Sequence, residues 1–248
     1  MWKFRGRPAA QLPCRMMLVL SIAAIVWGVL TSNYFGTSPL PGLKIFTDPA
    51  VKDANVQAFC FILAIAQLSL GRIWQAFRDR NFRNIGKNIG WMLILWGNFF
   101  LTLKLIVWPG DFPVYMYWLY GIGLLLVIAC DVNWKNMADV FQFPFNIIGS
   151  FVDVLSYIRL FAVGMAGYYI AFSFNGMASD IWKSSPWFLV FGVLVAVIGH
   201  AMNLGLCILS VLVHGVRLNT LEFSNHVGLS WSGSNFKPFK NNTKSEEN

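Results

Sequence analysis

Long apolar blocks separated by short polar connections run through most of the chain. A helix needs about 20 apolar residues to cross a bilayer, because it rises about 1.5 Å per residue against a hydrocarbon core of about 30 Å. Blocks of this kind lie at residues 13–34, 56–77, 89–108, 114–133, 145–174 and 186–218. The pattern therefore predicts an all-α fold, a polytopic transmembrane helical bundle of about six helices.

The last two predicted helices, 145–174 and 186–218, are too long to stand upright in a bilayer. About 30 residues give roughly 45 Å of helix, so we expect both helices to tilt strongly or to protrude. The transmembrane domain is expected at 13–218, between a basic N-terminal segment at 1–12 and a tail at 219–248.

Basic residues gather at the ends of the apolar blocks and predict the orientation of the chain. Only 12% of the 248 residues are charged, against about 25% in a typical soluble domain. The basic residues behind the net charge of +8 cluster in the N-terminal segment, in the connection between the second and third blocks, and in the tail. With six spans these regions share one side, so the positive-inside rule predicts a multi-pass cell-membrane protein with both termini cytoplasmic. The expected partner is the lipid membrane, and no nucleic acid is expected.

Arg159 stands in the middle of the fifth apolar block. Its guanidinium keeps its charge in a protein, and placing it at bilayer depth costs about 2.5–3.5 kcal/mol on insertion scales. Such an Arg either snorkels or pairs structurally inside a bundle, or it serves transport. Ser156 shares its helix side, and Asp153, nearly two turns earlier, is expected at the cytoplasmic mouth. Gln67, an amide deep in the second block, is expected to hydrogen-bond across the bundle or toward Arg159.

Polar and small residues form one stripe along the sixth predicted helix. They are His200, Asn203, Cys207, Ser210, His214 and Arg217, at successive steps of three, four, three, four and three residues. This spacing keeps side chains on one helix face, and lipid cannot satisfy polar groups, so the stripe must face protein or water. It is either a packing seam with interhelical hydrogen bonds or the wall of an aqueous ion path.

The sequence contains no pattern that predicts an enzyme active site. There is no nucleophile–base pair, phosphate-binding loop or paired carboxylate motif, and the four cysteines have no metal-ligand spacing. We therefore expect no catalytic residue, no cofactor and no metal. One class that fits these residues is a small secondary transporter or channel in which Arg159 binds an anionic substrate.

Two motifs resemble the membrane half of a stator subunit of rotary ATPases. The segment Asp153–Gly164 contains S-Y-x-R-L around Arg159, and His214–Phe223 reads H-x-x-R-L-x-x-x-E-F and includes Glu222. The later Lys237-Pro238-Phe239 also matches the tail of this family. The family is that of V-type and A-type ATPases, whose stator subunit is called subunit I in bacteria and archaea and subunit a in eukaryotes.

The resemblance implies a half-channel mechanism in a non-catalytic subunit. Protons or sodium ions would load a carboxylate on a rotating ring of c-type subunits through one half-channel and leave through a second, with Arg159 between the two. Arg217 would be the secondary charge. The resemblance and the polar patterns together predict a set of ion-translocation residues, namely Arg159, Arg217, His214, Ser156, Ser210, Asn203, His200, Gln67, Asp153 and Glu222.

Relative to the family, the chain is expected to lack the large cytosolic N-terminal domain and two membrane helices. That missing domain would contact the peripheral stalk and other V-type ATPase subunits. The chain would then be the product of a split or truncated gene, and a truncated assembly fragment without a transport role stays an alternative.

The orientation can be tested by cysteine-accessibility labelling. Single cysteines introduced at Lys87 and Lys240 are expected to react with an impermeant reagent from the same, cytoplasmic side, because both positions belong to basic regions. The measurement compares labelling in intact cells and inverted vesicles. Labelling from opposite sides would contradict the even number of spans.

Overall fold

The computed structural model describes residues 8–37, 42–43, 46, 52–78, 81–131, 137–184 and 186–229. Within these ranges the chain is all-α and holds no strand beyond one isolated bridge between Tyr34 and Thr37. Most of the predicted N-terminal segment and most of the tail lie outside the described residues.

Seven long helices account for most of the described residues. They are α1 (Pro8–Thr31), α3 (Lys52–Arg78), α4 (Phe82–Thr102), α5 (Val114–Cys130), α6 (Met137–Leu155), α7 (Ile158–Ser184) and α8 (Leu189–Ser210). Short π-helical segments extend α4 and α8, as η2 (Leu103–Val107), η4 (Val211–Gly215) and η5 (Leu218–Phe223), and the short helix α9 (Ser224–Val227) ends the described chain. A single 3₁₀ turn, η3 (Pro186–Phe188), precedes α8.

Five helical stretches are long and apolar enough to cross a membrane, counting α6 with α7 and α8 with its π segments and α9. The sixth, α5, is apolar but has 17 residues, close to the lower limit of about 17 for a spanning helix. These helices identify a membrane protein.

The helix predicted at 145–174 differs from the structure, which has two helices there. Helix α6 begins at Met137, and a turn at Ser156 and Tyr157 separates it from α7. At this break the backbone bonds shorten to i→i+3 pairs, because the Arg159 N–H donates to Ser156 O (3.3 Å) and the Leu160 N–H donates to Tyr157 O (3.0 Å). Apolarity continues through the break, so the hydrophobic pattern could not reveal it.

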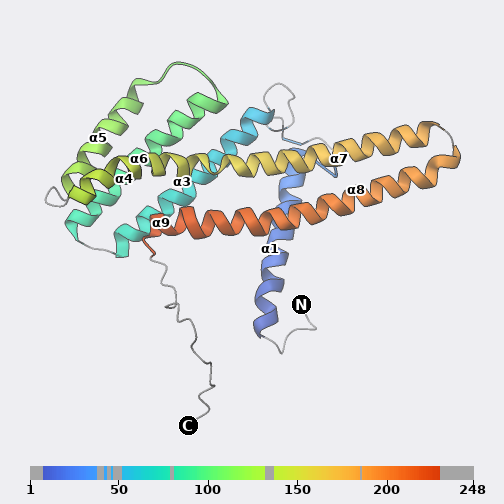
Figure 1. The fold of residues 1–248 in the computed structure, drawn as a ribbon, viewed down its shortest axis with the longest axis horizontal. Coiled ribbons are helices and arrows are strands. Elements are labelled where there is room, and N and C mark those ends of the chain that lie inside the picture. The colour runs from blue at the N-terminus through green and yellow to red at the C-terminus, as the bar shows by residue number, and fades with distance from the viewer. Residues whose placement is uncertain are drawn as a thin grey trace, which may run out of the picture.

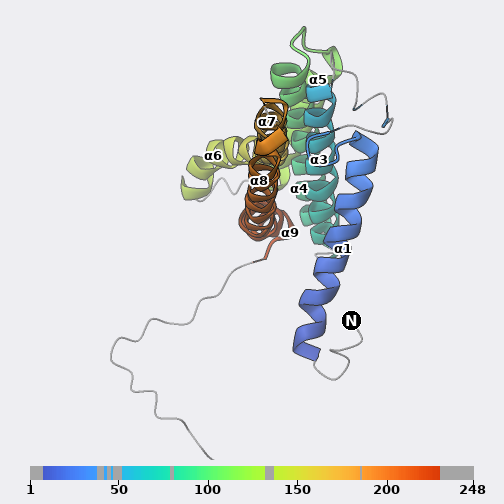
Figure 2. The same ribbon diagram turned by 90° about the vertical axis from the view of Figure 1, so that its right-hand side faces the viewer.

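The helices run in two main directions (Figure 1). Helices α3, α4 and α5 lie side by side, whereas α7 and α8 form a long antiparallel pair that runs across them. Figure 2 shows α7 and α8 almost end-on while α1, α3 and α4 are seen from the side. The strong inclination expected for the last two helices is thus present relative to the rest of the bundle.

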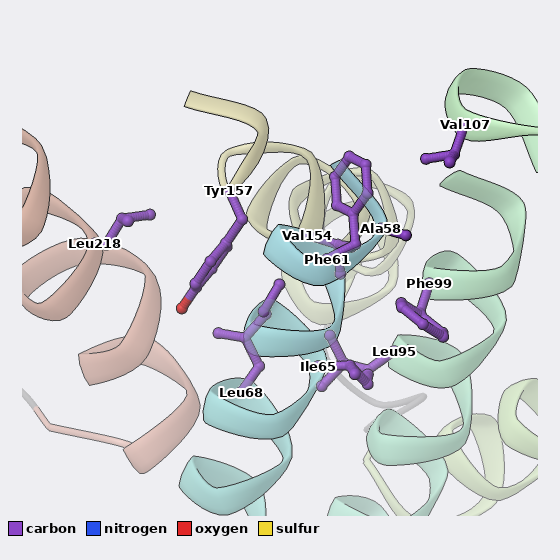
Figure 3. Packing of buried hydrophobic residues seen from close by; sticks show 11 residues of the cluster. Ala58, Phe61, Ile65, Leu68, Leu95, Phe99, Val107, Val154, Tyr157 and Leu218 are labelled. Carbon is purple, nitrogen blue, oxygen red and sulfur yellow. The ribbon is translucent and has the colours of Figure 1, made fainter. Parts of the chain in front are cut away.

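An apolar core joins the upright helices to the crossing ones (Figure 3). Phe61 and Leu68 of α3 and Leu95 of α4 are fully buried. Tyr157, at the break between α6 and α7, points toward Leu218 of η5 (Figure 3). The break is therefore fixed by side chains of α3 and η5.

Asn98 links three helices through its side chain. The Asn98 amide nitrogen donates to Ser150 Oγ of α6 (3.2 Å), and the Tyr120 hydroxyl of α5 donates to Asn98 Oδ1 (2.6 Å). Asn98 itself is 2% exposed. A buried amide with both ends satisfied specifies the register of the helices that it joins.

Close backbone approach at Gly199 holds α8 against α7. A Cβ at this position would overlap the ring of Phe174 in α7. Gly205, two turns later on α8, has open space around its Cα.

Gly199→Ala is expected to destabilise the protein by about 1–3 kcal/mol, because the added methyl overpacks the contact with Phe174. Gly205→Ala is the matched control and is expected to leave stability unchanged or to raise it by up to about 1 kcal/mol through helix propensity. Thermal unfolding of the detergent-purified variants measures both. Equal unfolding temperatures for the two variants would contradict this packing.

Candidate functional site

Arg159 is the second residue of α7 and lies half-buried immediately after the break. It lines a hollow of about 710 Å³ between α1, the turn that follows α1, α7 and α8. Its Nη1 is buried and has no hydrogen-bond partner among the described residues. A buried charged donor without an acceptor is costly, so this nitrogen favours an anionic partner in the hollow.

Four members of the predicted stripe line the same hollow from α8 and η4. They are Asn203, Cys207, Ser210 and His214. All four also line a second hollow of about 350 Å³ on the α7–α8 seam. The Asn203 side-chain amide donates to Gly167 O of α7 (3.0 Å), and His214 Nδ1 is buried without a partner in the described part of the chain. The structure thus brings the middle of the stripe together with Arg159.

His200 lies outside these two hollows and joins three elements instead. Its Nε2 is 2.9 Å from Asn175 Oδ1, and the Asn175 amide donates to Phe35 O (2.6 Å) in the turn after α1. The Phe35 ring also meets the imidazole edge-on, with 5.3 Å between centroids. Asn175 was not among the residues predicted from the sequence, because it lies just beyond the end of the predicted helix at 145–174.

Arg217 does not share the face of the other stripe residues. Its side chain is exposed, lines neither hollow and forms no ion pair with the described residues. The expected stripe assumed a uniform α-helix, but η4, which precedes Arg217, is π-helical. The wider turns of a π segment rotate every later side chain away from the α-helical register.

Gln67 contacts the last helix rather than Arg159. Its amide donates to Asn219 Oδ1 of η5 (3.0 Å), and the Asn219 amide donates to Gly215 O (2.9 Å). Of the two expected roles, the structure therefore shows the hydrogen bond across the bundle.

Asp153 belongs to a second polar cluster, at the junction of α3, α6 and α9. Its Oδ2 is 2.9 Å from Nε2 of His226, and Arg72 Nε of α3 donates to His226 Nδ1 (2.9 Å). A hollow of about 340 Å³ at this junction is also lined by Lys87 and Asp131, which pair at 2.6 Å. His226 could not be predicted from the sequence, because 73 residues separate it from Asp153 and no local spacing links the two.

Ser156 and Glu222 lie apart from the Arg159 hollow. The Ser156 hydroxyl donates back to Val152 O (3.0 Å) within the turn that ends α6. Glu222 is 3% exposed, and its Oε2 has no partner among the described residues. Tyr157 OH, on the core side of the break, is buried without a partner as well. The predicted site residues therefore divide into the hollow, the Asp153 cluster, positions within the bundle outside the hollow, and the exposed Arg217.

Comparison with curated proteins shows similarity to one type of subunit. The chain is 36% identical over 252 residues to V-type ATP synthase subunit I of Borreliella burgdorferi, which covers 91% of this chain and 41% of that protein. It is 34% identical to V-type ATP synthase subunit I 1 of Treponema pallidum, over 90% of this chain and 39% of that protein. A-type ATP synthase subunit I of Pyrococcus horikoshii is 26% identical over 96% of this chain.

The chain spans about two-fifths of the length of these curated relatives, which is consistent with a C-terminal part of such a protein. No family model matches it. No solved structure matches it either.

Aqueous thiol reagents can test whether the stripe faces water. Ser210→Cys and His214→Cys, in a background with the native cysteines replaced, are expected to react because both positions line the hollows. Leu212→Cys is the control, because Leu212 is exposed and lines neither hollow, so it is expected to face lipid. Mass spectrometry measures the modified fraction. Equal protection at all three positions would identify the stripe as a dry packing seam.

Proposed function

This chain belongs to the subunit I family of V-type and A-type ATP synthases, and we propose that it forms the ion-conducting part of the membrane stator in such a rotary ATPase. In this role it carries protons or sodium ions to and from a rotating ring of c-type subunits. Ion flow is thereby coupled to ATP hydrolysis or synthesis elsewhere in the complex.

The observation that carries this proposal is the unpartnered Nη1 of Arg159 in its hollow. A ring carboxylate that passes α7 would supply the missing acceptor, and a guanidinium within about 4–6 Å stabilises the ionised form of a carboxylate. The ring carboxylate would then give up its ion on approach and take one up on departure. Because the Arg159 charge is permanent, it also opposes direct passage of cations along the hollow.

The stripe supplies the polar groups of one ion path. Ser210 and His214 share the hollow with Arg159, and the buried His214 Nδ1 can accept a hydrogen bond from water or donate one, depending on tautomer. In this proposal the hollow is wet. Arg217, outside the hollow, would contribute only through its charge.

The Asp153 cluster fits the cytoplasmic end of a second path. Arg72 and Lys87 lie near the connection between α3 and α4, which carries further basic residues. In Figure 1 the start of α1, the end of α3, the start of α4 and α9 all lie toward the lower ends of the helices. This supports a multi-pass topology with both termini cytoplasmic, by the positive-inside rule.

In the proposed rotary ATPase this subunit would have further partners. The relatives are longer than this chain, and an N-terminal domain supplied with it would contact the peripheral stalk. A transporter that works alone predicts ion or anion flux by the purified chain, whereas the stator requires the ring. Copurification of a c-type ring therefore separates the two functions.

Arg159→Gln and Arg159→Lys are both expected to abolish ATP-driven ion transport while the complex still assembles. Gln has no charge, and Lys loses the planar fork and can deprotonate when buried. Ion uptake into vesicles that contain the reconstituted complex, with any N-terminal part supplied in trans, measures the effect. Arg217→Gln is the comparison and is expected to lower the rate only partly.

Wild-type pumping by Arg159→Gln would exclude Arg159 as the electrostatic gate. In that case Arg159 would be a structural cation of the bundle. Copurified ring protein in both variants shows that a lost signal comes from transport rather than from failed assembly.

A further inference from the structure

We propose that His226 is a positioning residue that holds the end of α6, and with it Arg159, through a bridge from Arg72 to Asp153 that requires a neutral imidazole. The bridge itself stands on the geometry alone. Its effect on ion transport rests on the function proposed above.

Three elements meet at the imidazole. Arg72 Nε of α3 lies 2.9 Å from His226 Nδ1, and Asp153 Oδ2 of α6 lies 2.9 Å from His226 Nε2. His226 is 1% exposed. A Cβ at Gly71 would lie 3.2 Å from the His226 Cβ, so α9 packs directly on the backbone of α3. The Arg72 guanidinium also lies over the Trp91 ring of α4, at 5.5 Å from its centroid.

The donor on one side determines the protonation of the ring. Arg72 Nε carries a hydrogen and cannot accept, so His226 Nδ1 must be the acceptor. The one remaining ring proton is then on Nε2 and is donated to Asp153 Oδ2. An imidazolium has two donors and no acceptor, so protonation would break the bond from Arg72. The contact between His226 and Asp153 is therefore a hydrogen bond from a neutral imidazole to a carboxylate, and the imidazole lies between that carboxylate and the Arg72 cation.

The charged side chains around the imidazole form ion pairs and hydrogen bonds with their neighbours. Lys87 of α4 pairs with Asp131 at 2.6 Å, and the Trp91 indole donates to the same carboxylate (2.9 Å). Arg78, the other cation on this end of α3, contacts Gly228 O (3.3 Å) rather than the imidazole. The adjoining segment η5 contributes Glu222, whose Oε2 has no hydrogen-bond partner among the described residues. The two cations and two carboxylates that line this hollow balance in formal charge, and each is paired with a neighbour or with His226, which favours a structural role for the imidazole.

The location of the bridge explains why it matters for Arg159. Asp153 lies in the last turn of α6, and Arg159 begins α7 just after the break at Ser156 and Tyr157. A helix break has lost regular i→i+4 bonds, so tertiary contacts on each side of it set its geometry. Tyr157 is held in the core, and Asp153 is held by His226. Loss of the bridge would free the end of α6 and displace the Arg159 guanidinium.

Two substitutions of His226 distinguish the effect of its hydrogen bonds from the effect of its ring volume. His226→Gln offers an amide oxygen to Arg72 and an amide N–H to Asp153 but does not titrate. His226→Phe keeps a ring and removes both nitrogens. Thermal unfolding of the purified chain in detergent between pH 5 and pH 8 measures the bridge without any transport assay. We expect His226→Phe to unfold about 3–10 °C below wild type at pH 8, and His226→Gln to stay within a few degrees.

The pH profile distinguishes the bridge from simple packing. Wild type is expected to lose stability relative to His226→Gln as the pH falls toward 5, because protonation removes the acceptor for Arg72. Asp153→Asn with wild-type His226 keeps an acceptor oxygen and is expected to retain most of the pH 8 stability, which provides a second measurement if His226→Phe does not fold. Parallel pH profiles for wild type and His226→Gln would overturn the neutral bridge.

Transport by the reconstituted complex tests the positioning role. We expect His226→Phe to lower the transport rate about 10-fold at pH 8 with the ring still bound. We expect His226→Gln to transport at the wild-type rate at pH 8 and to lose less of that rate than wild type as the pH falls toward 5. A normal rate in His226→Phe, together with its lowered unfolding temperature, would overturn positioning while the bridge remains. Failure of the wild-type complex to transport would count against the proposed function and would leave the stability result unaffected.

Discussion

A permanent positive charge in apolar surroundings is the constraint around which the described helices are arranged. Arg159 cannot discharge itself, so the protein must either hydrate it or pair it. Small residues of α7 and polar residues of α8 border the hollow in which its Nη1 stays unpaired, and the α7–α8 pair runs across the upright helices to form that wall. An open acceptor position next to a fixed cation is an unusual state for a protein interior, and the ring carboxylate of the proposed function would supply the missing acceptor.

Around the hollow, polar side chains are used mainly to fix helices to one another. Asn98, Asn175 and Gln67 each satisfy an amide across helix boundaries. Each such bond adds little energy in a membrane, roughly 0.6 kcal/mol on average, but it selects one register among several apolar packings. Ion paths need this kind of precision, because a shift of one residue exchanges a polar wall for a lipid-like one.

The position of Arg159 beside the middle of the stripe comes from the structure. The sequence allowed the helical class, the apolar blocks and the stripe itself to be predicted. Those features depend on local period and hydrophobicity, which any single chain displays. The break at Ser156 and Tyr157 was not predictable, because apolar residues continue through it and only the core contacts of Tyr157 reveal it. His226 was missed for a related reason, since its partners lie on α3 and α6 and share no motif with it. The expected place of Arg217 assumed α-helical turns, and whether a segment is α or π is decided by tertiary packing.

The π segments η4 and η5 change which face the last helix presents along its length. Each π segment inserts extra residues into a turn and so rotates the helix face that follows it. The residues before His214 and those after Arg217 can therefore present different faces, although they belong to one continuous helix. The first half keeps its polar face toward α7, whereas the second half places Leu218 in the core and Asn219 next to Gln67 of α3. A uniform α-helix with this sequence could not present both the polar face toward α7 and the packing face toward the core. The π segments therefore allow one helix to line the hollow of the proposed ion path at one end and to pack against the core at the other.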